Sequence, residues 1–354
     1  MEYKPSSAHV IKSVPKTPDN EYGVITVDSI NPNRPLIVVF GGELTGIPRY
    51  ANHYIKQMKS VLGGANISDV DIYSIYYDFG SRDTESERVQ LFRAAGHKIR
   101  NLTRSIQDID KNIAHMSETE PVPNYIKQLG NIILNPILVS GAESTRVPAS
   151  IAAQRASNVR FYAHSHGAAA ITILGEYMAD VMTQMGYTPD EIKQIQKNII
   201  VIQHGPITPL EHPRFTTLSF ASASDTKMNL HNRFSEYAYD NSFDLYPSYF
   251  SVAGANLFAA GEISTKLAKE HDNEGLTNPE TLTEDGLVLM AAERNAIVNA
   301  MRTAGRPVSS IRDLVSGDGV NFDMLKANGD WFFKNMIADL RQQKKQNPKH
   351  DYQK

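Results

Sequence analysis

Short apolar runs bounded by Pro, Gly or Asn recur along the chain and predict strands that are buried on both faces. Between these runs, apolar residues spaced three and four positions apart predict helices. Strands that alternate with helices in this way predict an α/β fold with a mostly parallel, doubly wound sheet. The predicted strands are 23–28, 36–40, 70–77, 159–163, 198–203, 215–220 and 249–253, and the predicted helices include 49–62, 84–117 and 168–185.

The same pattern predicts one α/β domain with three additions. Residues 1–21 are rich in Pro, Ser and Lys and are expected to form an irregular N-terminal arm. The domain spans 22–280, and within it 84–156 is expected to form a helical, lid-like insertion. Residues 281–354 begin with an amphipathic segment and are expected to form a helical C-terminal extension packed on the same domain.

Composition narrows the classes of partner and chemistry. The 354 residues carry 36 Lys+Arg against 39 Asp+Glu, and a net charge of -3 gives no electrostatic reason to expect a nucleic-acid partner. The absence of cysteine excludes disulfides, a thiolate nucleophile and cysteine-ligated metals. We expect no integral membrane segment, although transient contact with a lipid surface stays open. A cytoplasmic location is the default without a signal peptide; export by another route and the oligomeric state stay open.

One short motif carries chemistry. In Ala163-His-Ser-His-Gly167 a predicted strand runs directly into Ser165 and then into a predicted helix. A serine on such a sharp turn needs small residues two positions away on both sides, and Ala163 and Gly167 occupy those positions. Its hydroxyl is then raised to the carboxyl end of the sheet, beside the positive end of the helix dipole.

This motif resembles the nucleophile elbow of the α/β-hydrolase family, in particular its lipase and esterase branches. The family pattern G-x-S-x-G is present with alanine in place of the first glycine. Over the rest of 20–275 the agreement is one of element order. The resemblance implies an α/β-hydrolase fold, a Ser-His-Asp triad with Ser165 as nucleophile, and no cofactor.

The resemblance also indicates where the oxyanion donors lie. One donor comes from the residue after the nucleophile, here His166, and another from the loop after an early strand. The strand 36–40 runs into Gly41 and Gly42, so the Gly42 or Glu43 amide is the expected second donor, with Gly41 lining the pocket. The alternative is that the two glycines only allow a tight exit from the strand.

The acid and the base follow from chain order in the family. The acid comes after a strand beyond the nucleophile helix, which favours Asp225 and leaves Asp240 and Asp244 in reserve. The base comes after the acid. Of the three histidines there, His271 lies on a polar, loop-like segment and is the expected base; the other two are His231 and His350.

The remaining histidines near the motif allow more than one interpretation. His164 and His166 flank the serine and could supply two metal ligands, but no acidic or histidine partner lies at ligand spacing, so we expect no metal. His164 is expected to pack behind the serine. His204 ends a predicted strand, where it either lines the pocket or has a structural role.

The predicted activity is hydrolysis of a carboxylic ester, with a small-molecule or lipid substrate, and a lipid or long-acyl ester is favoured. Apolar residues in the insertion either line a groove for a long acyl chain or pack onto the sheet. The alternatives are deacylation of a protein by a thioesterase or amidase, and a non-catalytic binding module that keeps only the fold. The residues considered for the acyl groove are Ile132, Ile133, Leu134, Ile137 and Leu138.

Overall fold

The computed structural model describes part of the chain, and the statements below concern that part alone. The predicted helix over 84–117 lies outside it, as do Ser165, Asp225, His271 and Glu43. The described residues are 7–42, 48–78, 122, 124–141, 145–164, 166–205, 214–220, 248–250, 284–317 and 320–327.

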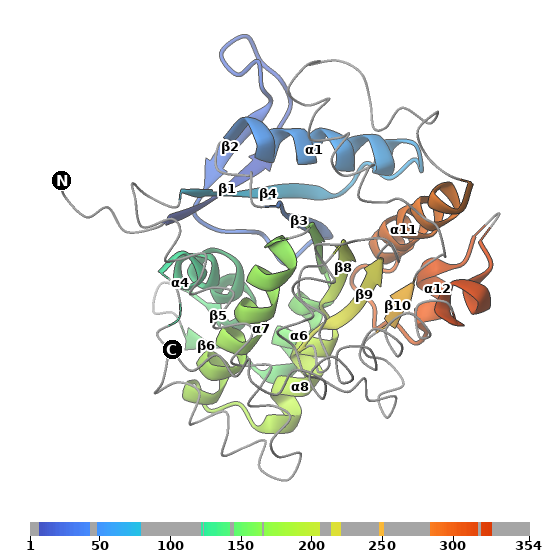
Figure 1. Cartoon of the computed structure of the whole chain (residues 1–354). Coiled ribbons are helices and arrows are strands. Elements are labelled where there is room, and N and C mark those ends of the chain that lie inside the picture. Colours follow the sequence, from blue (N-terminus) through green and yellow to red (C-terminus); the bar gives the residue numbers. More distant parts are fainter. Residues whose placement is uncertain are drawn as a thin grey trace, which may run out of the picture.

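A single mixed sheet of eight strands crosses the molecule in the order β10-β9-β8-β7-β3-β4-β1-β2 (Figure 1). Adjacent strands from β10 to β4 are parallel, whereas β1 is antiparallel to both of its neighbours. The prediction of a mostly parallel α/β sheet is therefore confirmed. The strands are β1 (Ser7–Ser13), β2 (Val24–Val27), β3 (Leu36–Phe40), β4 (Asp71–Asp78), β7 (Val159–His164), β8 (Ile200–His204), β9 (Thr216–Phe220) and β10 (Ser248–Phe250).

The strands predicted from continuous apolar runs lie in the buried centre of the sheet. Every residue of β3 and β9 is buried, as is all of β7 except His164. Such strands need cover on both faces, and helices provide it. The helices are α1 (Pro48–Gly63), α4 (Asn124–Leu129), the π-helix η2 (Gly130–Leu134), α5 (Asn135–Leu138), α6 (Ala149–Ala156), α7 (His166–Gln184), α8 (Pro189–Lys197), α11 (Glu284–Arg302) and α12 (Ile311–Val315).

Two apolar cores lie on the two faces of the sheet, which makes three layers. Helices α1, α11 and α12 pack over one face, against Val39, Ile200 and Ile202. Helices α4 to α8 pack over the other face, against Val38 and Phe161 (Figure 1). The separate small strands β5 (Val139–Ser140) and β6 (Thr145–Arg146) form a two-stranded sheet beside this second layer.

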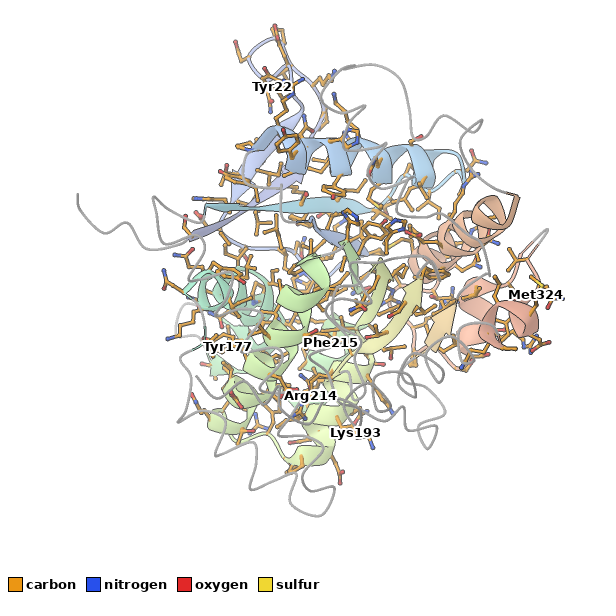
Figure 2. All side chains as sticks on the ribbon, in the orientation of Figure 1. Tyr22, Tyr177, Lys193, Arg214, Phe215 and Met324 are labelled. Atoms are coloured by element: carbon orange, nitrogen blue, oxygen red, sulfur yellow. The ribbon has the colours of Figure 1, made fainter. Side chains whose placement is uncertain are left out.

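The start of the chain corrects one expectation. Residues 7–13 are not an irregular arm but form β1, which pairs with both β2 and β4. The sequence of β1 alternates poorly between polar and apolar residues and has a low strand propensity. Hydrogen bonding to strands on both sides stabilises it as a strand nevertheless. The hairpin of β1 and β2 ends in a projecting tip at which Tyr22 is 74% exposed (Figure 2).

The described part of the predicted insertion packs against the sheet domain. The side chains of Ile133, Leu134, Ile137 and Leu138 are at most 1% exposed and belong to the core on the α7 face, and Ile132 packs against that core. These residues therefore pack onto the body of the domain. Among the described residues, no helix combines the length and the hydrophobicity that spanning a bilayer requires.

Candidate functional site

The carboxyl ends of β3, β7 and β8 meet at one edge of the sheet, where sites in parallel α/β folds are found. Register pairs place Phe40 beside Ala163 and His164 beside His204. The chain leaves these strands through Gly41-Gly42, through the segment before His166, and through Gly205. The structure therefore brings Gly41, Gly42, His164 and His204 to this edge together with the start of α7.

The expected triad is not among the described residues. Ser165, Asp225 and His271 lie outside them, as does Glu43. The backbone of His166 forms the first residue of α7, and its side chain is outside the described part of the structure. In chain order Asp225 follows β9 and His271 follows β10, so both lie beyond strands of the same sheet.

The junction of β7 and α7 is short in the sequence. Strand β7 ends at His164 and helix α7 begins at His166, which leaves one residue between them. A Cβ atom on Gly167 would lie 2.2 Å from the carbonyl oxygen of Phe40, so any larger residue would force α7 and β3 apart. The helix N-terminus therefore lies directly beside the exit of β3, where the Gly41-Gly42 loop begins.

A hydrogen-bonded group joins this loop to the end of β7. The Gly42 N–H donates to the hydroxyl oxygen of Tyr54 over 3.3 Å. The same hydroxyl is 2.8 Å from Nδ1 of His164. When the hydroxyl donates to His164 it still accepts from Gly42, so one arrangement of protons satisfies both bonds. Helix α1 thereby links the ends of β3 and β7 through a single side chain.

A second group lies on the next strand. Glu293 of α11 is buried, with a side chain that is 8% exposed, and both of its oxygens are engaged. The Tyr162 hydroxyl donates to Oε1 over 2.8 Å, and Nδ1 of His204 lies 2.7 Å from Oε2. Burial raises the pKa of Tyr162 well above its usual value, and the Glu293 charge adds to this. Tyr162 therefore stays protonated and continues to donate.

The two groups meet at the histidines. The ring centroids of His164 and His204 are 5.4 Å apart, with an angle of 53° between the ring planes. We call the six residues together the edge network. They come from the loop after β3 and from α1, β7, β8 and α11: Gly42, Tyr54, Tyr162, His164, His204 and Glu293.

Sequence reasoning missed Tyr54, Tyr162 and Glu293. Each lies on a predicted helix or strand, and none belongs to a short motif that would single it out in the sequence. One signal was present for Glu293, which falls on the stripe of Leu289, Ala296 and Ala300 in a helix. An acid on the apolar face of an amphipathic helix needs a buried partner.

The imidazole and carboxylate groups of the edge network are not arranged as the ligands of a metal ion. Within the described ranges, no group of three or more His, Cys, Asp or Glu side chains could hold a metal ion. The polar side chains instead form hydrogen bonds with one another and with the Gly42 amide. Such bonds fix the orientation of the side chains and of that amide.

Comparison with known proteins adds no family assignment. No protein-family model matches the chain, and no curated protein matches it either. The functional argument therefore depends on the residues and on their arrangement.

Proposed function

We propose that the protein is a serine hydrolase with an α/β-hydrolase fold that cleaves carboxylic esters. The observation that carries the proposal is the β7–α7 junction, where one residue, Ser165, separates a buried strand from a helix. Close contact of Gly167 with Phe40 places that helix N-terminus beside the Gly41-Gly42 loop. A nucleophile elbow requires this combination of a strand, a one-residue turn, a helix and an adjacent loop.

The proposed mechanism is acyl transfer to water. His271 removes the proton of the Ser165 hydroxyl as it attacks the ester carbonyl, and Asp225 holds the imidazole in the required tautomer. The amides of Gly42 and His166 stabilise the oxyanion of the tetrahedral intermediate, with the Glu43 amide as the alternative loop donor. His271 then protonates the leaving alcohol, and water attacks the acyl-enzyme by the same route.

The nucleophile is tested with Ser165→Ala. We expect the variant to lose turnover of p-nitrophenyl esters and labelling by a fluorophosphonate probe, while its thermal unfolding stays close to that of the wild type. Turnover that survives the substitution would refute the proposal. Wild-type protein that takes up no probe and cleaves no ester would instead favour a binding module.

The base is tested in the same assay. His271→Ala should abolish turnover, whereas His231→Ala is the matched control because it replaces another histidine beyond Asp225 in the chain. If His231→Ala abolished turnover and His271→Ala did not, the general base would be His231 rather than His271.

The proposal covers esters of both short and long acyl chains. The residues that could have lined a long groove pack in the core, so no described side chain favours a lipid over a short ester. Rates on acetyl and long-acyl p-nitrophenyl esters would separate the two, and an acyl-thioester substrate would test the thioesterase alternative.

A further inference from the structure

We propose that Tyr54 is a positioning residue that holds the Gly42 peptide group in place beside the start of α7, and that Glu293 anchors Tyr54 through the two histidines. The proposal rests on the proposed function, because it takes Gly42 as an oxyanion donor. It adds residues from α1 and α11 that the Ser-His-Asp mechanism does not require.

The first step concerns the Gly42 amide. Gly42 is buried at the exit of β3, and its N–H donates to Tyr54 over 3.3 Å, which is slightly beyond the usual range for such bonds. A developing oxyanion accepts a shorter and stronger bond. The Tyr54 oxygen can therefore hold the Gly42 peptide group in place in the free enzyme, and the N–H exchanges this weak bond for a stronger one when the oxyanion forms.

The second step concerns what fixes Tyr54. Its neighbours on α1, Ala51, Ile55 and Met58, are at most 3% exposed, so the helix is held firmly on the sheet. The hydroxyl is then fixed by the 2.8 Å contact with Nδ1 of His164. A positioning group carried by a packed helix holds its target more accurately than one carried by a loop.

The third step concerns the anchor. A buried carboxylate is costly unless each oxygen has a partner, and Glu293 has Tyr162 on one oxygen and His204 on the other. Its bond fixes the His204 ring, because a carboxylate requires the proton to be on Nδ1. The His164 ring packs against the His204 ring. The position of Glu293 is thus transmitted through the histidines to Tyr54.

The fourth step concerns location. Elsewhere on this face of the sheet the core consists mainly of apolar side chains such as Ile37, Val39 and Ile200, and the buried Arg160 donates to the carbonyl oxygen of Ala300. Apolar residues at the carboxyl edge would have avoided the desolvation of a carboxylate and two imidazoles. The edge network instead lies where the Gly42 amide and the start of α7 meet, which is where orientation affects the reaction.

The primary test is Tyr54→Phe, which removes the hydroxyl and keeps the ring. We expect kcat per active site to fall about 10- to 100-fold, because small errors of alignment at the reacting centre have effects of that size. KM should change less than about twofold, since the oxyanion bond forms in the transition state. Endpoint labelling by a fluorophosphonate counts the folded sites, and its rate should fall with kcat.

The matched control is Tyr73→Phe. That hydroxyl also accepts a backbone N–H, from Asn31, and also donates to a side chain, Asp71, with both distances at 3.3 Å. It belongs to the core on the opposite face of the sheet. We expect its kcat per labelled site to match the wild type. A Tyr54→Phe variant with kcat within about twofold of the wild type, or a Tyr73→Phe variant with an equal loss, would overturn the proposal.

A second variant tests the anchor and remains informative if Tyr54→Phe folds poorly. Glu293→Gln keeps the size of the side chain and removes its charge, so kcat should fall with little change in KM. If both residues act through one network, the double variant should lose little more than Tyr54→Phe alone; additive losses would overturn the link between them. An active Ser165→Ala variant refutes the proposed function itself, whereas inactive Ser165→Ala beside fully active Tyr54→Phe refutes the role of Tyr54 alone.

Discussion

The absence of a side chain at Gly167 sets how closely α7 approaches β3. The nearest atoms to a Cβ at this position belong to the backbone of Phe40, which cannot rotate away as a flexible side chain would. Any added methyl group must therefore be accommodated by a shift of the helix or of the strand. Both carry groups that the proposed mechanism uses, so stability and activity depend on the same contact.

We predict that Gly167→Ala lowers the free energy of unfolding by about 1–3 kcal/mol, as overpacking does, and also lowers ester turnover per folded molecule. Gly63→Ala is the matched control, because a Cβ at the end of α1 would meet no atom within 4 Å. Denaturant unfolding and p-nitrophenyl ester assays of both variants provide the measurement. Equal stability of the two variants would contradict the close approach.

At the residue scale, the strand and the helix on either side of the motif could be predicted, whereas the network beside them could not. Ala163-His-Ser-His-Gly167 is local, and its small positions have a direct steric reason, so a single sequence is enough to find it. Tyr54 and Glu293 are separated from that motif by about a hundred residues or more. They are brought beside it by tertiary packing, which local patterning does not encode.

At the element scale, the contrast between β3 and β1 explains what the pattern could find. Leu36–Phe40 is a continuous apolar run between Pro35 and Gly41, and it forms a central strand. Ser7–Ser13 mixes polar and apolar residues near Pro15, and its pairing with β2 and β4 supplies the stability that its composition lacks. Strand preference depends on context of this kind.

Two isoleucines of the N-terminal hairpin test whether β1 belongs to the core. Ile11 is 2% exposed in the core on the α1 face, so Ile11→Ala should lower the free energy of unfolding by about 2–5 kcal/mol. Ile25 on β2 is 46% exposed, so Ile25→Ala should change it by no more than about 0.5 kcal/mol. Urea unfolding of the two variants gives the comparison. Similar small losses would mean that β1 is only loosely attached.

At the scale of the whole molecule, the two faces of the sheet each bury a tyrosine whose ionisation is suppressed. Burial, with a smaller contribution from Asp71, raises the pKa of Tyr73 to about 12. Burial, and then the charge of Glu293, also raise the pKa of Tyr162 well above its usual value. Tyr73 lies in the core on one face and Tyr162 in the core on the other, so the two tyrosines become exposed together only when the domain unfolds.

These shifts predict how stability changes in alkali. Above pH ~10 an unfolded chain loses the tyrosine protons that the folded chain keeps, so the free energy of unfolding falls as pH rises. For Tyr73 the loss should extend from pH ~10 to a pH equal to its folded-state pKa of about 12. Unfolding followed by denaturant and by phenolate absorbance measures it. Tyr73→Phe should flatten the decline, and Tyr22→Phe, at the exposed hairpin tip, should not; equal slopes in the two variants would contradict the assignment.

The edge network also bears on the order in which the protein becomes complete during synthesis. A ribosome releases a chain from its amino end, so Gly42, Tyr54, His164 and His204 emerge well before Glu293. Until α11 follows, the two imidazoles lie at the edge of the sheet without the carboxylate that fixes them. The edge network is therefore complete only after α11 has been made, and a nascent fragment that ends before α11 lacks Glu293.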